Sequence, residues 1–418
     1  MLKIQSGVAA LRPSDTLTIN QLSHQLQSEG KTIYKFGFGQ SPFPVPPVVQ
    51  EALRKNAHQK DYLPVQGLGM LREKIAAHTN QLLENTNYDA DNVFIGPGSK
   101  ELIYLVQLAI DAPLLLPSPS WVSYAPQAQI VGKKAHWIPT QLNHWKLKAA
   151  VLKNYLERHR IQDGVLILNY PNNPTGQTFS TTELKAIAEV CRQFGLIVIS
   201  DEIYGLLNFG GEYHSIANFY PEGTLITTGL SKWAGAGGWR MGAMIIPNEL
   251  KSLYQTMRVL ASETFSAVSA PIQFAAVTAY EGDSSLEDYK NASRCILQKT
   301  ANFCYQKLIT GGVEIQTADG GFYLFPNFTR LVELTNSVRF CQQLLNETGV
   351  ALLPGTSFGR PANELTARLC FVDFDGEVAL QHFYKHGQIE EEDLPVLFPK
   401  LVEGMSQLMG WVGKKVEV

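Results

Sequence analysis

Between about residue 90 and residue 246, short apolar runs alternate with segments in which apolar residues recur at helical spacing. The short runs are almost uninterrupted in hydrophobicity, as strands buried on both faces of a parallel sheet should be. The pattern therefore predicts successive βα units that build a mostly parallel sheet. The six predicted strands are Asn92–Ile95, Pro113–Leu116, Gly164–Leu168, Leu196–Ser200, Thr224–Thr228 and Ala243–Ile246.

One of the intervening helices is well marked. Ser180 and Glu183 have the spacing of a capping box, in which each side chain bonds to the backbone N–H of the other residue. The apolar residues that follow fall on one helical face: Leu184, Ile187, Ala188, Cys191 and Phe194. We expect a helix that begins at Ser180.

The pattern changes near residue 282, where the sequence Gly282–Ser285 interrupts the chain before a long helical stretch, Leu286–Leu308. We place a domain boundary there, which gives a large domain of residues 48–284 and a small domain of residues 1–47 and 285–418. Strands mixed with helices beyond the boundary favour an α+β small domain. These predicted strands are Val313–Gln316, Phe322–Phe325, Val350–Leu353 and Ala367–Val372.

Composition is that of a globular protein, with 45% hydrophobic and 17% charged residues in a chain of 418. The 35 basic and 38 acidic side chains leave a net charge of -3, so nucleic acid is not expected as a partner. The five cysteines form no close CxxC pair and lie in predicted helices or strands, which favours buried free thiols and no metal site.

The N-terminal sequence, residues 1–17, has neither a long apolar stretch nor an arginine-rich amphipathic face. No later segment offers about 18 uncharged apolar residues, the length needed to cross a membrane. We therefore expect a soluble cytoplasmic protein that does not contact membranes.

Ligands of an open α/β sheet bind beyond the carboxyl ends of its strands. The first predicted strand is followed by Gly96-Pro97-Gly98-Ser99-Lys100 and an apolar helix, whose N-terminal N–H groups and dipole favour phosphate. An ordinary glycine turn before a helix has the same pattern. After the second strand, Trp121 is placed where a flat heterocycle could stack, although an aromatic residue at a strand end often belongs to the core.

Two further strand ends carry polar groups that suit a pyridine ring. In the segment Asn169–Gly176, two prolines and a glycine fix the backbone and would present Asn173 as a hydrogen-bond donor, with an Asx-type turn as the alternative. Asp201 ends the next strand and would keep a pyridine nitrogen protonated, so that the ring withdraws electrons. Asn173 and Tyr204 would donate hydrogen bonds to the phenolic oxygen of the ring. Taken by itself, Asp201 also fits a helix cap or a surface ion pair.

Lys232 follows the fifth predicted strand, in a segment rich in small residues that ends at Arg240. A lone lysine is usually a solvated surface charge. In this setting, however, Lys232 can lose its proton and form an imine with an aldehyde, while Arg240, Ser99 and Lys100 bind a phosphate. When released from the imine, the lysine would act as general base and then general acid at the substrate's α-carbon. This combination points to pyridoxal 5'-phosphate.

Taken in order, these elements resemble the class I/II aminotransferases, the aspartate aminotransferase-like family of fold-type I pyridoxal phosphate enzymes. The similarity covers nearly the whole chain, beginning at Phe38-Gly39-Gln40-Ser41-Pro42-Phe43, continuing through Tyr62–Gly67 and Leu71–Glu73, and ending at Ala367–Leu369. The resemblance implies an α/β large domain, with a mostly parallel seven-stranded sheet flanked by helices, and a smaller α+β domain.

The resemblance also implies roles for residues outside the strand ends. Tyr62 would reach the phosphate of the neighbouring subunit in a homodimer with shared active sites, and Trp121 would stack on the cofactor ring. Arg368 would bind the α-carboxylate of the substrate through two bonds. Gly39 would offer its backbone amide to the same carboxylate, and Asn173 would also bind the substrate. Without the resemblance, Arg368 fits a strand arginine in a surface ion pair.

The sequence departs from the family pattern in places. Gly229 stands where many relatives have a phosphate-binding serine, so that Thr228, Ser231 or neither supplies this hydroxyl. The loop Gly235–Gly238 is richer in glycine than usual, and the loop Gln40–Phe43 lacks the family's common acidic residue.

We therefore predict a transaminase that moves the α-amino group of an L-amino acid to a 2-oxo acid, with ping-pong kinetics and an internal aldimine on Lys232. A lyase that catalyses β- or γ-elimination is the first alternative, because the lysine and the ring serve both reactions. The second is a non-catalytic sensor fused to a DNA-binding domain, for which the segment before Gly39 leaves no room. Dicarboxylic, aromatic and bulky apolar amino acids all stay open as donors.

Overall fold

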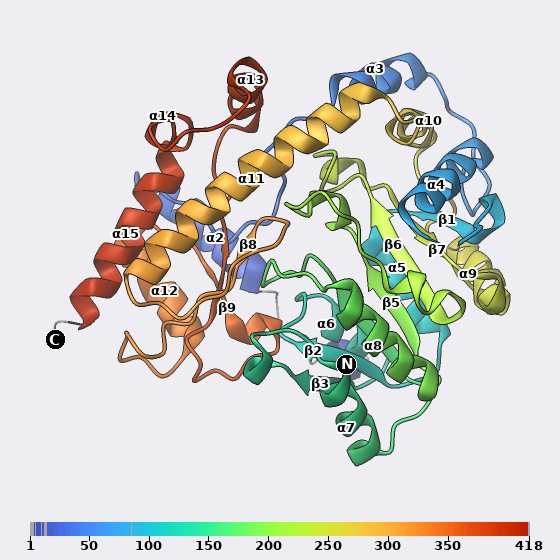
Figure 1. The fold of residues 1–418 in the computed structure, drawn as a ribbon, viewed down its shortest axis with the longest axis horizontal. Helices are drawn as coiled ribbons and strands as arrows, with labels where there is room; N and C mark the ends of the chain where they lie inside the picture. The colour runs from blue at the N-terminus through green and yellow to red at the C-terminus, as the bar shows by residue number, and fades with distance from the viewer. Residues whose placement is uncertain (1–3, 5, 10, 12–14, 85, 417–418) are drawn as a thin grey trace.

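The computed structural model describes residues 4, 6–9, 11, 15–84 and 86–416, so part of the N-terminal segment considered for targeting lies outside the described residues. Two sheets organise the fold (Figure 1). The large sheet contains β1 (Val93–Gly96), β2 (Leu114–Ser118), β3 (Ala135–Pro139), β4 (Val165–Asn169), β5 (Ile197–Asp201), β6 (Thr224–Gly229) and β7 (Gly242–Ile245). The small sheet contains β8 (Tyr323–Leu324), β9 (Leu353–Pro354) and β10 (Ala367–Cys370).

Helices cover both sheets. They are α1 (Ser6–Ala9), α2 (Asp15–Ser28), α3 (Pro47–Asn56), α4 (Gly69–Leu82), α5 (Ser99–Ala109), α6 (Tyr124–Ile130), α7 (Ala149–His159), α8 (Thr181–Gln193), α9 (Lys251–Glu263), α10 (Ala270–Ala279), α11 (Ser284–Thr310), α12 (Ser337–Thr348), α13 (Gly376–His386), α14 (Leu394–Leu397) and α15 (Pro399–Val416). The predicted capping box begins α8: Ser180 Oγ accepts from Glu183 N at 3.2 Å, and Glu183 Oε2 accepts from Ser180 N at 3.0 Å.

The large sheet has the strand order β1-β7-β6-β5-β4-β2-β3. Its pairs are parallel from β3 through β6, and β7 runs antiparallel to both β6 and β1. The predicted mostly parallel sheet of seven strands flanked by helices is confirmed. The ends of the six predicted strands lie within about two residues of the observed ends.

The hydrophobicity of the strands is almost continuous because helices pack on both faces of the sheet. In β4, Val165 and Ile167 join a cluster with residues of α5 and α6, whereas Leu166 and Leu168 join a second cluster with residues of α7 and α8. Successive side chains of a strand point to opposite faces, so every position of β4 is buried.

The small sheet is antiparallel, with β10 between β8 and β9. Tyr34 forms a bridge with Val350, which joins the N-terminal segment to this part of the molecule. The strand predicted at Val313–Gln316 is wrong: Glu314 forms only an isolated bridge with Asn327, and its neighbours in the segment pair with no strand that the structure describes. The long helix α11 extends from the large sheet to the small one (Figure 1), and the domain limits at residues 47/48 and 284/285 stay a prediction.

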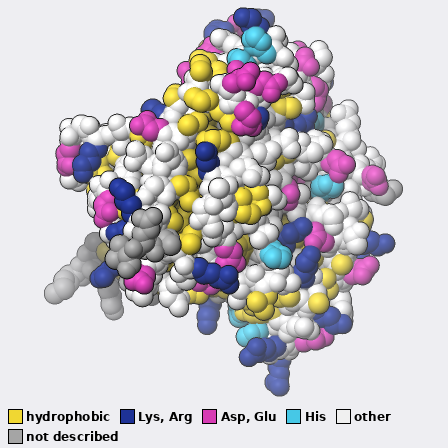
Figure 2. Space-filling view, turned by 60° about the vertical axis from the view of Figure 1, so that its left-hand side comes forward, with side chains coloured by type: hydrophobic (Ala, Val, Ile, Leu, Met, Phe, Trp, Pro, Cys, Tyr) yellow, Lys and Arg dark blue, Asp and Glu magenta, His cyan; other side chains and the backbone are white. Residues whose placement is uncertain are grey.

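Basic and acidic side chains are interspersed on the face of the molecule drawn in Figure 2. All five cysteines are free, as expected, but Cys295 is only partly buried because it lies beside the buried stripe of α11. Within the described part of the chain, no helix has both the length and the apolar character needed to span a membrane.

Candidate active site

The polar strand ends predicted from the sequence meet at one edge of the large sheet. Asn169, Asp201 and Thr227 are register partners at the carboxyl ends of the parallel strands β4, β5 and β6. Gly96 of β1 and Gly229 of β6 both pair with Gly242 of β7 at the same edge. The fold therefore brings residues from five strands to a single site, as expected for an open α/β sheet.

Asp201 is held in the floor of this site with 3% of its surface exposed. Tyr124 Oη donates to its Oδ2 at 2.6 Å, and Thr227 Oγ1 donates to its Oδ1 at 2.9 Å. Burial raises the pKa of Asp201, and the hydrogen bonds from Tyr124 and Thr227 oppose that rise. Such a carboxyl suits a cationic partner better than water, because a positive charge would offset its desolvation.

Lys232 follows β6, and its Nζ donates to the carbonyl oxygen of Gly39 at 2.8 Å. Its side chain is partly buried between aromatic rings: Nζ lies 5.4 Å from the ring centroids of both Tyr204 and Phe322. Desolvation, followed by the positive charge of Arg368, lowers the pKa of Lys232 to about 8. A substantial fraction of the amine is therefore neutral near physiological pH, as a nucleophile requires.

Tyr204 is buried beside Lys232, and its hydroxyl lies 2.7 Å from the hydroxyl of Tyr323. Burial raises the pKa of Tyr204 well above its usual value, and the neighbouring Tyr323 raises it further. Both phenols are therefore neutral hydrogen-bonding groups over the physiological range of pH.

Arg368 lies in β10 of the small sheet with 4% of its surface exposed. Its Nη1 donates to Asn173 Oδ1 at 3.0 Å and its Nη2 donates to the Gly37 carbonyl oxygen at 2.7 Å, while the buried Nε has no partner among the described residues. These bonds use two of the five guanidinium N–H groups. A buried guanidinium without a carboxylate is costly, so the site suits an anionic ligand.

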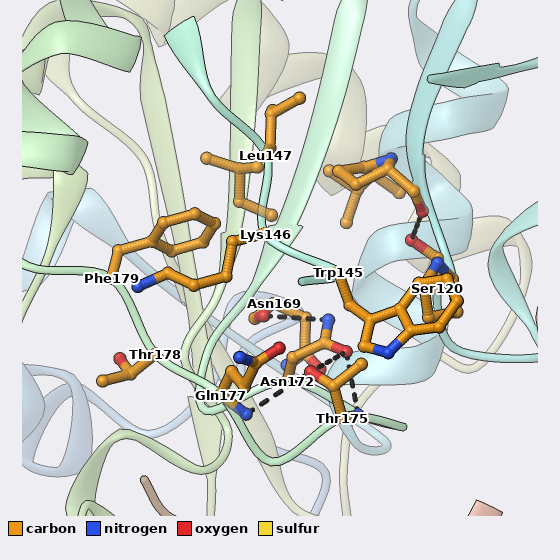
Figure 3. A pocket seen from close by; sticks show the side chains of 14 residues that line it. Ser120, Trp145, Lys146, Leu147, Asn169, Asn172, Thr175, Gln177, Thr178 and Phe179 are labelled. Carbon is orange, nitrogen blue, oxygen red and sulfur yellow. Dashed lines mark hydrogen bonds between the residues drawn. The ribbon is translucent and has the colours of Figure 1, made fainter. Parts of the chain in front are cut away.

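Hydrogen bonds from side chains within the turn stabilise the segment that carries Asn173 (Figure 3). Asn172 Nδ2 donates to the Asn169 carbonyl at 3.2 Å, and Thr175 donates through N and Oγ1 to Asn172 Oδ1 at 3.2 and 3.1 Å. The backbone N of Asn173 donates to Asn169 Oδ1 at 2.7 Å. With its Oδ1 held by Arg368, the Asn173 side chain has its Nδ2 group left to donate.

The pocket drawn in Figure 3 lies against this turn. Its walls do not include Lys232, Asp201 or Arg368. They come from residues 117, 119–120, 145–147, 167–169, 172, 175 and 177–179. It is therefore a neighbour of the site and not the place where the charged groups meet.

A second positively charged corner lies at the N-terminus of α5. Arg240 Nη2 donates to the Pro97 carbonyl at 3.1 Å, and a Cβ atom added at Gly98 would lie 2.3 Å from that nitrogen. Gly98 has φ +88°, so both its conformation and its contact with Arg240 require glycine. Lys100 Nζ lies 4.9 Å from the centroid of the Trp121 ring, which joins this corner to the predicted stacking residue.

Gly229 has no space for a side chain, which explains its departure from the family pattern. A Cβ atom there would lie 2.7 Å from the carbonyl oxygen of Met241 and 3.0 Å from Cα of Gly242. A serine at this position would force β6 and β7 apart. Whether Thr228, Ser231 or neither supplies the missing hydroxyl stays open.

The resemblance predicts that Tyr62 reaches the neighbouring subunit's phosphate and that the backbone amide of Gly39 meets the substrate's carboxylate. Tyr62 is 95% exposed and thus not buried in the site of its own chain. Gly39 lies against Lys232, but it is its carbonyl oxygen that is engaged. The roles predicted for both residues stay predictions.

Sequence reasoning missed residues that contact the predicted ones. Tyr124 is the first residue of α6, three residues after Trp121, so its place soon after the end of β2 was a usable signal. Thr227 could be found only from the pairing of β5 with β6, and Gly37 and Tyr323 only from the packing of the small sheet against the large one.

Comparison with known proteins decides the family. The family model described as aminotransferase class I and II matches residues 31–376. The chain belongs to this family. The aminotransferase is 33% identical over 377 residues to an aspartate aminotransferase of Geobacillus stearothermophilus, a match that covers 87% of this chain and 93% of that protein.

The aminotransferase also resembles a probable aspartate/prephenate aminotransferase of Aquifex aeolicus, with 31% identity over 86% of this chain and 92% of that protein. In structure, it matches an aspartate aminotransferase from Thermus thermophilus with maleate at a TM-score of 0.82 and 25% identity, over 92% of this chain and all of that one. The predicted family, and a transaminase activity that depends on pyridoxal phosphate, are thereby confirmed.

The residues present fit this cofactor. The α5 terminus with Arg240 offers donors and positive charge to a phosphate, the buried Asp201 suits a protonated ring nitrogen, and Lys232 is an amine with a lowered pKa. The unpartnered Nε of Arg368 is a further buried donor beside them.

Proposed function

We propose that this transaminase carries the α-amino group of an L-amino acid to a 2-oxo acid in two half-reactions, with Lys232 as the residue that binds the cofactor covalently. The observation that supports this most strongly is the lowering of the Lys232 pKa to about 8 beside a buried carboxyl and a buried guanidinium. A ping-pong order follows, because the amino group stays on the enzyme between the two substrates.

Lys232 has two tasks in this proposal. As a neutral amine it would hold the cofactor at its aldehyde carbon, with loss of water, and once displaced by the substrate's amine it would move the proton at the substrate's α-carbon. The carbonyl of Gly39 accepts from Nζ and so limits the positions that the amine can adopt. When bound, pyridoxal phosphate supplies an electron-withdrawing ring that stabilises the negative charge left by that proton.

Asp201 and its hydrogen-bond partners would set how strongly this ring withdraws electrons. Asp201 would pair with the ring nitrogen, and the bonds from Tyr124 and Thr227 fix the orientation of its two oxygens. Asn173 and Tyr204 would donate to the phenolic oxygen on the other edge of the ring. Trp121 would cover one face of the ring.

The phosphate would bind at the N-terminus of α5. Gly98, Ser99 and Lys100 offer backbone or hydroxyl groups there, and Arg240 adds a fixed positive charge. We also propose a homodimer in which Tyr62 reaches the phosphate of the other subunit, a role that its 95% exposure in the single chain allows.

Arg368 would bind the substrate's α-carboxylate through two of its three remaining N–H groups. We propose aspartate as the first amino donor to test. The names of the relatives from Geobacillus stearothermophilus and Aquifex aeolicus support this choice, as does the Thermus thermophilus structure with maleate. A cytoplasmic location stays part of the proposal.

A half-reaction tests this function. Aspartate added to the cofactor-loaded enzyme without a 2-oxo acid should convert the bound aldehyde to its amine form in one turnover, and a 2-oxo acid should then restore the aldehyde band. Continuous release of ammonia without an acceptor would instead mean elimination and would overturn the proposal. Lys232→Ala should show neither spectral change.

A further inference from the structure

The most informative contact without an assigned role is the one between Tyr204 and Tyr323. Tyr323 lies in β8 with 1% of its surface exposed, and its hydroxyl is 2.7 Å from that of Tyr204. The two rings meet edge to face, with centroids 5.6 Å apart and an interplanar angle of 80°. Tyr323 is thus a candidate to influence the site through Tyr204.

The position of Tyr323 is fixed from several sides. Its strand pairs with β10, which carries Arg368, and the guanidinium of Arg368 lies 4.7 Å from the centroid of the Tyr323 ring. A Cβ atom added at Gly39 would overlap the Tyr323 hydroxyl, and one added at Gly176 would lie 2.4 Å from the Tyr323 carbonyl oxygen. The hydroxyl therefore has little freedom to leave Tyr204.

Tyr204 and Tyr323 each have one hydroxyl proton to donate. Burial raises the pKa of both phenols, so each keeps its proton at the pH of catalysis. One of the two O–H groups makes the bond between the rings, and the other points out of the pair. If Tyr204 donates to the cofactor, Tyr323 must be the donor within the pair.

We propose that Tyr323 is a positioning residue whose hydroxyl donates to Tyr204 Oη and so directs the Tyr204 proton toward the phenolic oxygen of the cofactor. The inference rests on the role proposed for Tyr204 above. A donor whose own oxygen accepts a hydrogen bond is also a stronger donor, because hydrogen bonds in a chain polarise one another. Tyr323 would thereby favour the anionic form of that oxygen.

The test is a double-mutant cycle of Tyr323→Phe and Tyr204→Phe, with Tyr254→Phe as a matched control. Tyr254 of α9 is also buried, and its hydroxyl donates to the Val93 carbonyl at 3.3 Å. Val93 is the first residue of β1, at the end of that strand away from the site. The readout is the pH midpoint of the cofactor's visible absorption band, together with the dissociation constant of pyridoxal phosphate. Thermal melting of each variant checks its folding.

Tyr323→Phe should raise the midpoint by roughly 0.4 to 1 pH unit, the shift equivalent to one hydrogen bond. The midpoint should move upward because Tyr204 would stabilise the anionic phenolic oxygen of the cofactor less well. The imine between Lys232 and the cofactor should then stay protonated up to a higher pH. In the Tyr204→Phe background the same substitution should add no shift, and Tyr254→Phe should leave the wild-type midpoint unchanged.

An unchanged midpoint in a folded Tyr323→Phe enzyme would overturn the inference. An equal shift in the Tyr204→Phe background would overturn it too, because Tyr323 would then act without Tyr204. Borohydride trapping on Lys232 separates this failure from failure of the proposed function: a trapped lysine with an unchanged midpoint removes only the role of Tyr323.

Discussion

The substitution Arg368→Lys probes how the substrate's carboxylate is recognised. Lysine keeps the positive charge, so the influence of position 368 on the pKa of Lys232 is largely preserved. It removes the planar pair of donors and cannot reproduce both bonds that Arg368 makes, to Asn173 Oδ1 at 3.0 Å and to the Gly37 carbonyl at 2.7 Å. The variant therefore separates geometry from charge.

The size of the effect follows from the number of bonds. A carboxylate on Arg368 accepts two charge-assisted hydrogen bonds, of which lysine can supply one in the same place. A hydrogen bond to a charged group contributes about 1.5–3 kcal/mol. The kcat/KM for an amino acid should thus fall roughly 10- to 150-fold.

The assay compares two substrates in the first half-reaction: the amino acid, and the amine with the same side chain that lacks the α-carboxylate. Arg368→Lys should slow the first by the stated factor and change the second by less than about threefold, since no carboxylate bond is lost. Arg330→Lys, at an exposed position, is the control and should change neither rate. An equal loss for both substrates would refute the assignment of Arg368 to the carboxylate.

Further predictions concern Lys232, the proposed phosphate site at the N-terminus of α5, and the second subunit. In the cofactor-free protein, Lys232→Met should raise the free energy of unfolding at pH 7 by about 1–3 kcal/mol, because a lysine with its pKa lowered to about 8 is destabilising while it is charged. Melting curves should show this gain shrinking as pH rises from 8 through 10.5, the unfolded value, and a gain independent of pH would contradict the cause given. Gly98→Ala should weaken pyridoxal phosphate binding roughly 5- to 150-fold in a fluorescence titration, because alanine at φ +88° is strained and would displace Arg240, whereas Gly410→Ala, with open space at its Cβ, should leave the affinity unchanged. Tyr62→Phe should weaken cofactor affinity roughly 10-fold or more without lowering the melting temperature of the cofactor-free protein, and an unchanged affinity would remove Tyr62 from the phosphate site.

Much of the large sheet was predictable because each strand is buried on both faces and is bounded by turns. The exception is β3 (Ala135–Pro139), which was missed. It lies at the edge of the sheet beside β2, and only Ile138 of its residues is buried. A half-exposed edge strand lacks the continuous apolar run that marks the central ones.

Some residues of the site were also predictable from the sequence, and others were not. Asn173, Asp201 and Lys232 follow parallel strands, so the rule that ligands bind at strand ends places them together without any coordinates. The contacts between the two sheets were beyond such a rule. Tyr323 and Gly37 reach the site through the packing of the small sheet, which no periodicity within a segment encodes.

The central claim is that Nζ of Lys232 carries the cofactor. Borohydride reduction of the enzyme loaded with pyridoxal phosphate, followed by peptide mass spectrometry, tests it most directly. The account predicts a single stable adduct on the peptide that contains Lys232, and none in Lys232→Ala. An adduct on another lysine, or no adduct at saturating cofactor, would contradict it.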